Sequence, residues 1–272
     1  MSLLEVKILF QTIYRLFIEL TNRKTTSLLL AKFARSKMSR FLIPSFSRVY
    51  KINQLEMEKP IHHYQSLHEF FTRKLKPDAR KISQDPLSVI SPVDATIEDL
   101  GEISLDHSIT VKGKKYSVSE MLGGEPEAQK YINGTYIIFY LSPSNYHRIH
   151  SPISGKVIGK RTIGTKSYPV NKYGIKYGKR PLSKNYRIIT EMYYNGVSMA
   201  MVKVGAMFIN SIEILHSHDE VEKGSEIAYF SFGSTVVLLF EPGTFTPGLK
   251  SLPCTICVGE CIGYLKGTSN HV

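Results

Sequence analysis

The sequence predicts an α+β protein in which N-terminal amphipathic helices precede a largely antiparallel, β-rich core. Apolar residues recur with helical spacing near the N-terminus, and the basic stretch that follows also suits helices. From about residue 91, short runs of β-branched and aromatic residues alternate with Gly, Pro and Asn. Strands and helices do not alternate there, which argues against a doubly wound parallel sheet. A length of 272 residues with 42% apolar content is sufficient for a substantial core.

The first segment, residues 3–20, predicts an amphipathic helix. At about 100° per residue most of its apolar side chains fall on one half of a helix. Glu5, Lys7, Arg15 and Glu19 interrupt the apolar residues well before the ~18 in a row that a membrane span requires. The flanks also differ from those of a cleaved signal peptide.

The next segment, residues 20–55, contains no Asp or Glu but eight Lys or Arg. Apolar residues such as Leu28, Phe33 and Phe41 are interleaved with these basic residues. Unopposed basic residues beside apolar anchors favour a membrane surface rich in anionic lipid. The alternative is a pair of helices packed on the core with a solvated basic face, and both can hold. We predict a membrane-apposed helical region at 1–55 and a second domain at 56–272.

The part from residue 91 onward contains four clear strand candidates. They are Thr135–Leu141, Gly155–Ile163, Val197–Val204 and Ser234–Phe240. No repeat, low-complexity tract or interdomain linker separates them. We therefore expect these strands to share one core.

The charge balance favours an anionic partner. The net charge is +12 and the pI is near 9.4, which suits a nucleic acid, an anionic membrane or an anionic substrate. A second stretch without acidic residues lies between Glu127 and Glu191 and carries twelve Lys or Arg. Such a stretch either forms a solvated face or holds a phosphate-bearing ligand.

The three cysteines, Cys254, Cys257 and Cys261, lie close together in sequence. Their odd number, without a secretory signal, argues against a disulfide framework and favours a reducing cytoplasmic setting. Cys254-x-x-Cys257 lacks a second pair of metal ligands at usable spacing. We interpret the cysteines as small apolar core residues and expect no metal site.

Reactive side chains gather at three places in the sequence. Asp94 follows Ser91-Pro-Val, His147 and His150 lie in a segment bracketed by Pro143 and Pro152, and Ser234 follows a glycine. Loops carry a disproportionate share of catalytic residues. Taken singly, each place also has an ordinary structural interpretation, as a turn, a metal half-site without further ligands, or the start of a strand.

Taken together, Asp94, His150 and Ser234 supply an orienter, a base and a nucleophile. A serine hydrolase is one interpretation, but Ser234 lacks the Gly-x-Ser-x-Gly turn of an α/β-hydrolase. Gly233 has no side chain to shield its carbonyl from the hydroxyl of the next residue. The pattern therefore favours an N→O acyl shift and cleavage of the chain itself at Gly233–Ser234.

These motifs resemble those of the phosphatidylserine decarboxylase family, of the pyruvoyl-dependent bacterial type. The resemblance rests on several segments that occur in order between about residues 60 and 263. The segments are Phe70-Phe-Thr-Arg-Lys-Leu-Lys-Pro, Ser91-Pro-Val-Asp, Val111-Lys-Gly-Lys-Lys-Tyr-Ser-Val, Tyr146-His-Arg-Ile-His-Ser-Pro, Tyr168-Pro-Val-Asn, Val204-Gly-Ala and Lys223-Gly-Ser-Glu-Ile-Ala-Tyr-Phe-Ser-Phe-Gly-Ser-Thr-Val-Val. The chain departs from the family at Tyr186, where Glu is usual, and at Met207–Asn210, which ends in Ile-Asn where a Val-Gly pair is usual.

The resemblance implies a proenzyme that matures by self-cleavage. In it, Asp94 orients His150, which removes the hydroxyl proton of Ser234. Ser234 then becomes the covalent pyruvoyl cofactor at the start of an α chain, 234–272, beside a β chain, 1–233. The pyruvoyl group acts as the electron sink for decarboxylation of phosphatidylserine to phosphatidylethanolamine and CO2. The family also implies that His147 supplies the proton that replaces CO2.

The implied partners are the phosphatidylserine substrate, an anionic membrane surface and the two chains of one precursor, with a homodimer as a further option. The implied location is peripheral, on the cytoplasmic face of the cell membrane. Two alternatives remain: a serine hydrolase using Asp94, His150 and Ser234, and a non-catalytic basic module that binds membranes or nucleic acid. Nucleic acid is disfavoured because aromatic residues do not form a base-stacking pattern.

Overall fold

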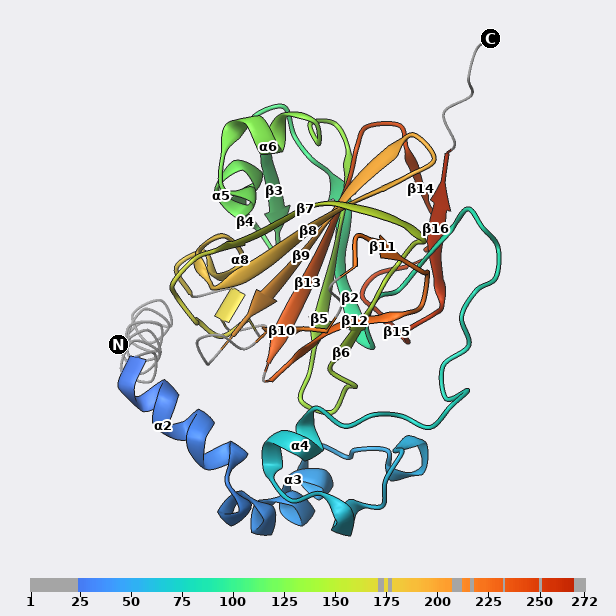
Figure 1. Cartoon of the computed structure of the whole chain (residues 1–272). Helices are drawn as coiled ribbons and strands as arrows, with labels where there is room; N and C mark the ends of the chain where they lie inside the picture. Colours follow the sequence, from blue (N-terminus) through green and yellow to red (C-terminus); the bar gives the residue numbers. More distant parts are fainter. Residues whose placement is uncertain are drawn as a thin grey trace.

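A computed structural model describes residues 24–170, 174–175, 178–206, 212–215, 218–231, 233–249 and 251–266. It confirms the α+β class: short helices at the N-terminal side lie below a body of mostly antiparallel sheets (Figure 1). The helix expected at residues 3–20 lies outside the described residues. No helix in the described part is long and apolar enough to cross a bilayer.

The lower layer consists of short helical segments. They are α2 (Lys24–Arg35), η1 (Lys37–Leu42), α3 (Ile43–Val49), η2 (Gln54–Glu56), η3 (Ile61–His63) and α4 (Leu67–Phe71). Ser66 caps α4 by accepting a hydrogen bond from the Glu69 amide. The layer has a small core of its own, formed by Ile43, Ile52, Met57, Tyr64 and Phe70.

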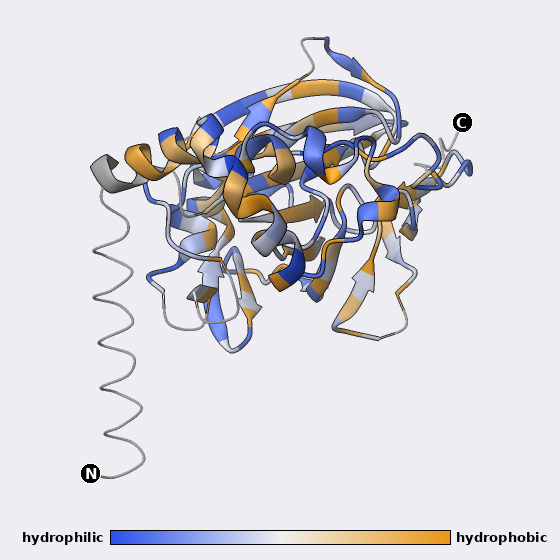
Figure 2. Cartoon of the chain, turned by 90° about the horizontal axis from the view of Figure 1, so that it is seen from below, coloured by the Kyte–Doolittle hydropathy of each residue, from blue (hydrophilic) through white to orange (hydrophobic). Residues whose placement is uncertain are grey.

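The lower layer also exposes apolar side chains. They are Leu28, Leu29, Leu30, Met38, Phe41, Val49 and Leu55. In Figure 2, which views the molecule from below, apolar stretches run along α2 and the short helices after it. Basic residues of the same region, including Lys32, Lys37 and Arg48, are exposed as well. The apolar and basic character expected for residues 20–55 is therefore present on the surface.

The upper body is built on an eight-stranded sheet with the order β11-β7-β8-β9-β13-β5-β2-β15. Every neighbouring pair in it is antiparallel. The strands are β2 (Ala95–Glu102), β5 (Thr135–Leu141), β7 (Gly155–Ile163), β8 (Arg187–Tyr194), β9 (Val197–Gly205), β11 (Glu220–Val221), β13 (Ser234–Phe240) and β15 (Cys254–Ile256). All four predicted strands are confirmed, with β9 one residue longer than expected.

Smaller elements cover both faces of this sheet. On one face lie α5 (Val118–Leu122), α6 (Glu125–Gln129), α8 (Pro181–Lys184) and the hairpin of β3 (Ser108–Val111) with β4 (Lys114–Ser117). On the other lie the sheets β1-β16-β14 and β10-β12-β6, formed by β1 (Ser88–Ile90), β6 (Arg148–His150), β10 (Ile212–Ile214), β12 (Glu226–Phe230), β14 (Phe245–Pro247) and β16 (Cys261–Leu265). Because β13 is central and covered on both faces, all seven of its residues are buried.

The cysteines are free thiols, as expected, but they are half-buried rather than fully in the core. Cys254 packs against the main core from β15, and Cys261 lies on β16. No cluster of three metal-ligating side chains occurs among the described residues. Burial raises the pKa of both Cys254 and Cys257.

The second acid-free stretch does not form one uniformly basic surface. Lys130 and Arg161 pair with Glu191, and Arg161 also pairs with Glu127. Arg148 pairs with Glu226. Acidic residues from outside the stretch thus neutralise several of its charges.

Candidate active site

Strand pairing places three of the four candidate residues, Ser234, His147 and Asp94, at the lower end of the main sheet. Ser234 begins β13 and lies opposite Leu141, the last residue of the antiparallel β5. The loop after β5 leads to His147, and Asp94 directly precedes β2, whose first pairs are with the end of β5. His150 ends the short strand β6. This end of the body faces α4 (Figure 1).

Ser234 is fully buried, and its hydroxyl has no hydrogen-bond partner among the described residues. Apart from its two chain neighbours, a Cβ atom added to Gly233 would meet no atom of the described residues within 4 Å. Packing therefore does not require a glycine at position 233. The glycine is instead suited to exposing its carbonyl to the adjacent hydroxyl.

His147 is fully buried, and its Nδ1 lies 2.9 Å from the carbonyl oxygen of Asn145. Because a carbonyl only accepts, Nδ1 carries the hydrogen and Nε2 holds the lone pair. Nε2 has no partner in the described part of the chain, and the ring lies 4.0 Å from that of Phe71, centre to centre. Burial and the charge of Arg73 lower the pKa of His147 to about 3. The imidazole is therefore neutral near pH 7.

His150 is hydrogen-bonded at both ring nitrogens. Its Nδ1 donates to the carbonyl of Gly224 at 2.7 Å, and its Nε2 accepts from the Tyr146 hydroxyl at 3.0 Å. Burial lowers the pKa of His150, whereas the Gly224 hydrogen bond and the charges of Glu226 and Asp94 raise it. Burial also raises the pKa of Tyr146, so this hydroxyl keeps its proton and acts as the donor.

Asp94 is held by an arginine that sequence reasoning did not single out. Arg80 donates from Nε to Oδ1 at 2.9 Å and from Nη2 to Oδ2 at 2.5 Å, and the Val258 amide donates to Oδ1 at 2.8 Å. Arg80 also binds Glu56, at 2.9 Å. These contacts raise the pKa of the Arg80 guanidinium, with the Asp94 hydrogen bonds contributing most.

The three residues of the expected relay are therefore not hydrogen-bonded to one another in this structure. Within the described residues, no hydrogen bond joins Asp94 to His150 or His150 to Ser234. Asp94 acts on His150 through its charge, which favours the protonated imidazole. The sequence analysis did not assign a role to Arg80 or Tyr146. Tyr146 begins the motif that contains both histidines, and Arg80 lies three residues after the motif that starts at Phe70.

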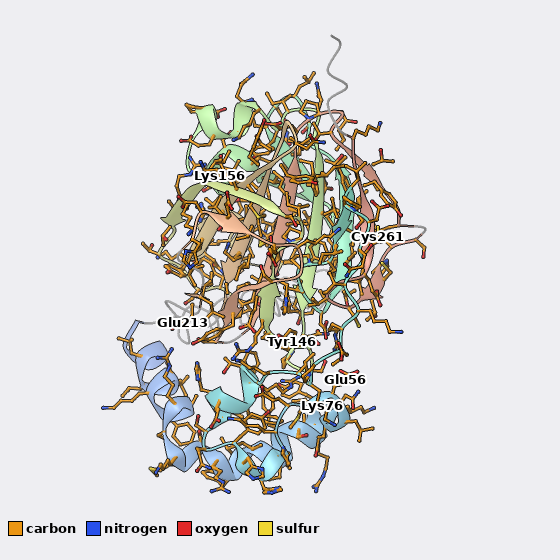
Figure 3. The ribbon with its side chains drawn as sticks, turned by 45° about the vertical axis from the view of Figure 1, so that its right-hand side comes forward. Glu56, Lys76, Tyr146, Lys156, Glu213 and Cys261 are labelled. Atoms are coloured by element: carbon orange, nitrogen blue, oxygen red, sulfur yellow. The ribbon has the colours of Figure 1, made fainter. Side chains whose placement is uncertain are left out.

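A cavity of about 260 Å³ opens beside His150. Its lining includes Tyr146, Arg80 and Lys76 as well as His150. Figure 3 shows Tyr146, Lys76 and Glu56 at the junction between the helical layer and the β body. The candidate site thus lies where the two layers meet.

Comparison with known proteins shows which family these features belong to. The family profile described as phosphatidylserine decarboxylase matches residues 67–264. The chain belongs to the phosphatidylserine decarboxylase family. It is 59% identical to a phosphatidylserine decarboxylase proenzyme of Anoxybacillus flavithermus over 93% of this chain and 96% of the relative. It is 57% identical to a proenzyme of that name from a Geobacillus strain over 93% of this chain and 98% of the relative.

The family assignment makes the chain a decarboxylase and confirms the resemblance found in the sequence. Of its two departures from the family pattern, Met207–Asn210 lies outside the described residues. Around the other, Asn185 hydrogen-bonds Tyr168 and Gly205, and the buried Arg187 binds the carbonyl oxygens of Met121, Asn185 and Glu120. Both side chains hold main-chain segments together. Tyr186 packs against the main core.

Proposed function

We propose that this phosphatidylserine decarboxylase is a proenzyme that cuts itself between Gly233 and Ser234 and converts Ser234 into its pyruvoyl cofactor. The observation that carries the proposal is the Ser234 hydroxyl, which is buried at the start of a central strand and has no hydrogen-bond partner in the described part of the chain. An unsatisfied buried hydroxyl costs stability and marks a functional position. The adjacent Gly233 and the nearby histidines supply the target and the bases.

Self-cleavage requires no reactant other than the chain itself and one water molecule. The Ser234 oxygen attacks the Gly233 carbonyl carbon, the Gly233–Ser234 C–N bond breaks, and an ester forms. Loss of the Cα proton breaks the Cβ–oxygen bond and frees the Gly233 carboxylate. Water then replaces the nitrogen of residue 234, which leaves as ammonia. The mature protein consists of a β chain, 1–233, and an α chain, 234–272.

The two histidines have separate roles, His150 as the base in self-cleavage and His147 as the proton donor in turnover. His150 takes the Ser234 proton at Nε2, which must first release the Tyr146 hydroxyl. Asp94 favours the resulting imidazolium through its negative charge. His147 returns a proton to the substrate carbon after CO2 leaves. In the precursor, burial and Arg73 oppose protonation of His147, so turnover needs a change in this surrounding charge.

A pyruvoyl group fits position 234 because its formation removes the Ser234 hydroxyl oxygen, and no hydrogen bond of the described residues is lost with it. When present, the group supplies the electron sink for decarboxylation of phosphatidylserine to phosphatidylethanolamine and CO2. Burial of the site in the core excludes bulk water, which would otherwise compete for the developing carbanion.

An intact-mass measurement of purified protein tests the proposal. We expect two fragments, the smaller starting at residue 234 with a keto group in place of its amine. The Ser234→Ala variant should stay intact and decarboxylate nothing. An uncleaved wild-type chain that reacts with a fluorophosphonate at Ser234 would instead support the serine hydrolase.

We also propose that residues 1–55 bind an anionic membrane and hold the enzyme there as a peripheral protein at the cytoplasmic face. Exposed apolar side chains beside exposed basic ones support this for the described part, 24–55. Phe41→Asp should weaken binding to phosphatidylserine-containing vesicles about tenfold or more, since a buried Phe contributes about 1.5–3 kcal/mol. Leu105→Asp, at an equally exposed leucine of the β body, is the matched control. Equal effects of both substitutions would contradict the proposal.

A further inference from the structure

Arg73 is a buried cation without a carboxylate partner in the described part of the chain. It is only 4% exposed, and its Nη2 donates to the carbonyl oxygens of Ser144 at 2.8 Å and Asn145 at 3.0 Å. Its Nε and Nη1 are buried and have no hydrogen-bond partner among the described residues. A buried guanidinium with unused donors and no carboxylate partner is costly even beside the Phe70 ring, whose centroid lies 5.7 Å away, so such an arrangement calls for a ligand that supplies the missing acceptors.

Two other arginines in similar surroundings, Arg187 and Arg80, have their donors occupied. Arg187 is equally buried and uses Nε, Nη1 and Nη2 on three carbonyl oxygens. Arg80 pairs with Asp94 through two nitrogens and also reaches Glu56. Unused donors therefore distinguish Arg73 from both of them.

A cavity of about 270 Å³ lies against Arg73, and we refer to it as the Arg73 cavity. Its lining is Glu58, Lys59, Tyr64, Glu69, Thr72, Arg73, Lys74 and Arg148. The Tyr64 side chain lines the cavity as well, and its hydroxyl is buried. Guanidinium, phenol and ammonium groups together match the oxygens of a phosphate-type anion.

The acidic residues in this lining leave a positive balance. Glu69 accepts from the Gln65 amide at 2.8 Å and pairs with Lys59, while Arg148 pairs with Glu226. Lys74 is exposed and forms no ion pair within the described residues. Arg73 and Lys74 therefore bring positive charge that is not neutralised by a direct partner, against the single carboxylate of Glu58.

The Arg73 cavity adjoins the candidate active site. Arg73 and His147 both hydrogen-bond the carbonyl oxygen of Asn145. Thr72, which lines the cavity, follows Phe71, whose ring lies against that of His147. The cavity also lies against the helical layer through Tyr64 and α4.

We propose that the Arg73 cavity binds the phosphodiester of the phosphatidylserine headgroup, with Arg73 as its main ligand. This rests on the proposed function, since it assigns one part of that substrate to one part of the site. The substrate carboxylate is the less suitable occupant. Its charge must leave during decarboxylation, and a fixed cation would stabilise the ground state against that change. The phosphodiester keeps its charge throughout.

Binding of the phosphodiester also prepares His147 for its proposed role. An anion beside Arg73 offsets the positive charge that opposes protonation of the imidazole. The bound substrate therefore makes its own proton donor easier to charge.

Kinetics with two soluble substrates test this assignment. One is dihexanoyl phosphatidylserine, and the other is a serine alkyl ether of similar length without a phosphate. Arg73→Lys keeps the charge but loses the planar fork. We expect it to lower kcat/KM about tenfold or more for the phosphodiester and less than threefold for the ether. Lys74→Gln should act in the same direction more weakly, and exposed Lys266→Gln, directly after β16, should change neither value.

Equal losses on both substrates would overturn the assignment, because Arg73 would then act only through His147 or the fold. The extent of self-cleavage shows whether each variant is folded. If Arg73→Lys fails to mature, the ratio of the kcat/KM losses of Lys74→Gln on the two substrates tests the assignment. The exposed Lys74 side chain has no structural partner among the described residues, so this variant should fold.

Ligand-induced stabilisation of the uncleaved Ser234→Ala protein gives a readout without catalysis. Monomeric dihexanoyl phosphatidylserine should raise its melting temperature, and adding Arg73→Lys should remove most of that rise. A rise with inorganic phosphate alone would assign the cavity to free phosphate and overturn the headgroup assignment. The two proposals can also fail separately. If phosphatidylserine raises the melting temperature in an Arg73-dependent way but the wild-type protein never cleaves, headgroup binding at the Arg73 cavity is supported and the proposed function is contradicted.

Discussion

Arg73 and His147 share one acceptor, the carbonyl oxygen of Asn145, at 3.0 Å and 2.9 Å. This contact fixes the tautomer of His147 with its hydrogen on Nδ1, and it places a buried positive charge close to the ring. Nε2, which has no partner among the residues that the structure describes, is therefore held as a neutral base in the precursor. Whatever changes the charge at Arg73 also changes the proton affinity of His147.

The depressed pKa of His147 makes the stability of the precursor depend on pH. The unfolded imidazole takes up a proton as the pH falls through 6.5, whereas the folded one does so only near 3. The contribution of His147 to stability is therefore complete above 6.5 and is lost between about 6.5 and about 3, at about 1.4 kcal/mol per pH unit.

Urea unfolding of the Ser234→Ala precursor at pH 7 and pH 5 measures this loss. We expect the drop between the two pH values to be about 2 kcal/mol smaller when His147→Phe is added. The comparison cancels the carboxylates and His150, which titrate in both proteins. The same drop in both would show that His147 is protonated normally in the folded chain.

Removing the Tyr146 hydroxyl should release Nε2 of His150. In the structure this hydroxyl occupies the lone pair that the Ser234 proton needs. We expect Tyr146→Phe to speed self-cleavage about five- to twelvefold, since it removes a competing bond of about 1–1.5 kcal/mol. A time course of precursor on denaturing gels measures the rate. Slower cleavage would instead make the hydroxyl a proton relay between the two side chains.

Gly233→Ala should separate chemistry from folding at the cleavage site. Beyond the adjacent residues, the added methyl group meets no atom of the described chain within 4 Å, so the described fold has room for it. We expect self-cleavage to slow at least tenfold, about 1.4 kcal/mol, because the methyl group crowds the carbonyl under attack. On the Ser234→Ala background, the free energy of unfolding should change by less than about 1 kcal/mol. A large loss of stability would place the requirement for glycine in the fold.

Arg80→Gln should destabilise the precursor strongly. It leaves the buried carboxylate of Asp94 without its cation, and breaking such a pair costs about 3–5 kcal/mol. Lys115→Gln removes one partner of the exposed Lys115–Asp106 pair and should change the free energy of unfolding far less, because solvent screens this pair. Denaturant unfolding of both Ser234→Ala double variants provides the comparison. Similar small losses would show that Arg80 is not needed to hold Asp94.

Much of the body could be predicted because its signals are local. The run of β-branched and apolar residues in Ser234–Phe240 predicted the strand that became β13, and Thr135–Leu141 predicted its neighbour β5. Ser234 and His147 were likewise found from short motifs. The order of the strands was not predictable in the same way, because pairing joins residues far apart in the chain.

The sequence by itself determined the α+β class, the positions of four strands and the set of reactive side chains, since each depends on neighbouring residues or a recognised motif. Only the tertiary structure decided their partners. Asp94 binds Arg80 and the distant Val258 amide rather than His150, and His150 binds Gly224 and Tyr146. Burial, which no local pattern specifies, then set the protonation of His147 and left Arg73 with unused donors. Long-range pairing places these groups together, and the loss of water around them shifts their pKa values and leaves their unused donors and acceptors available to a substrate.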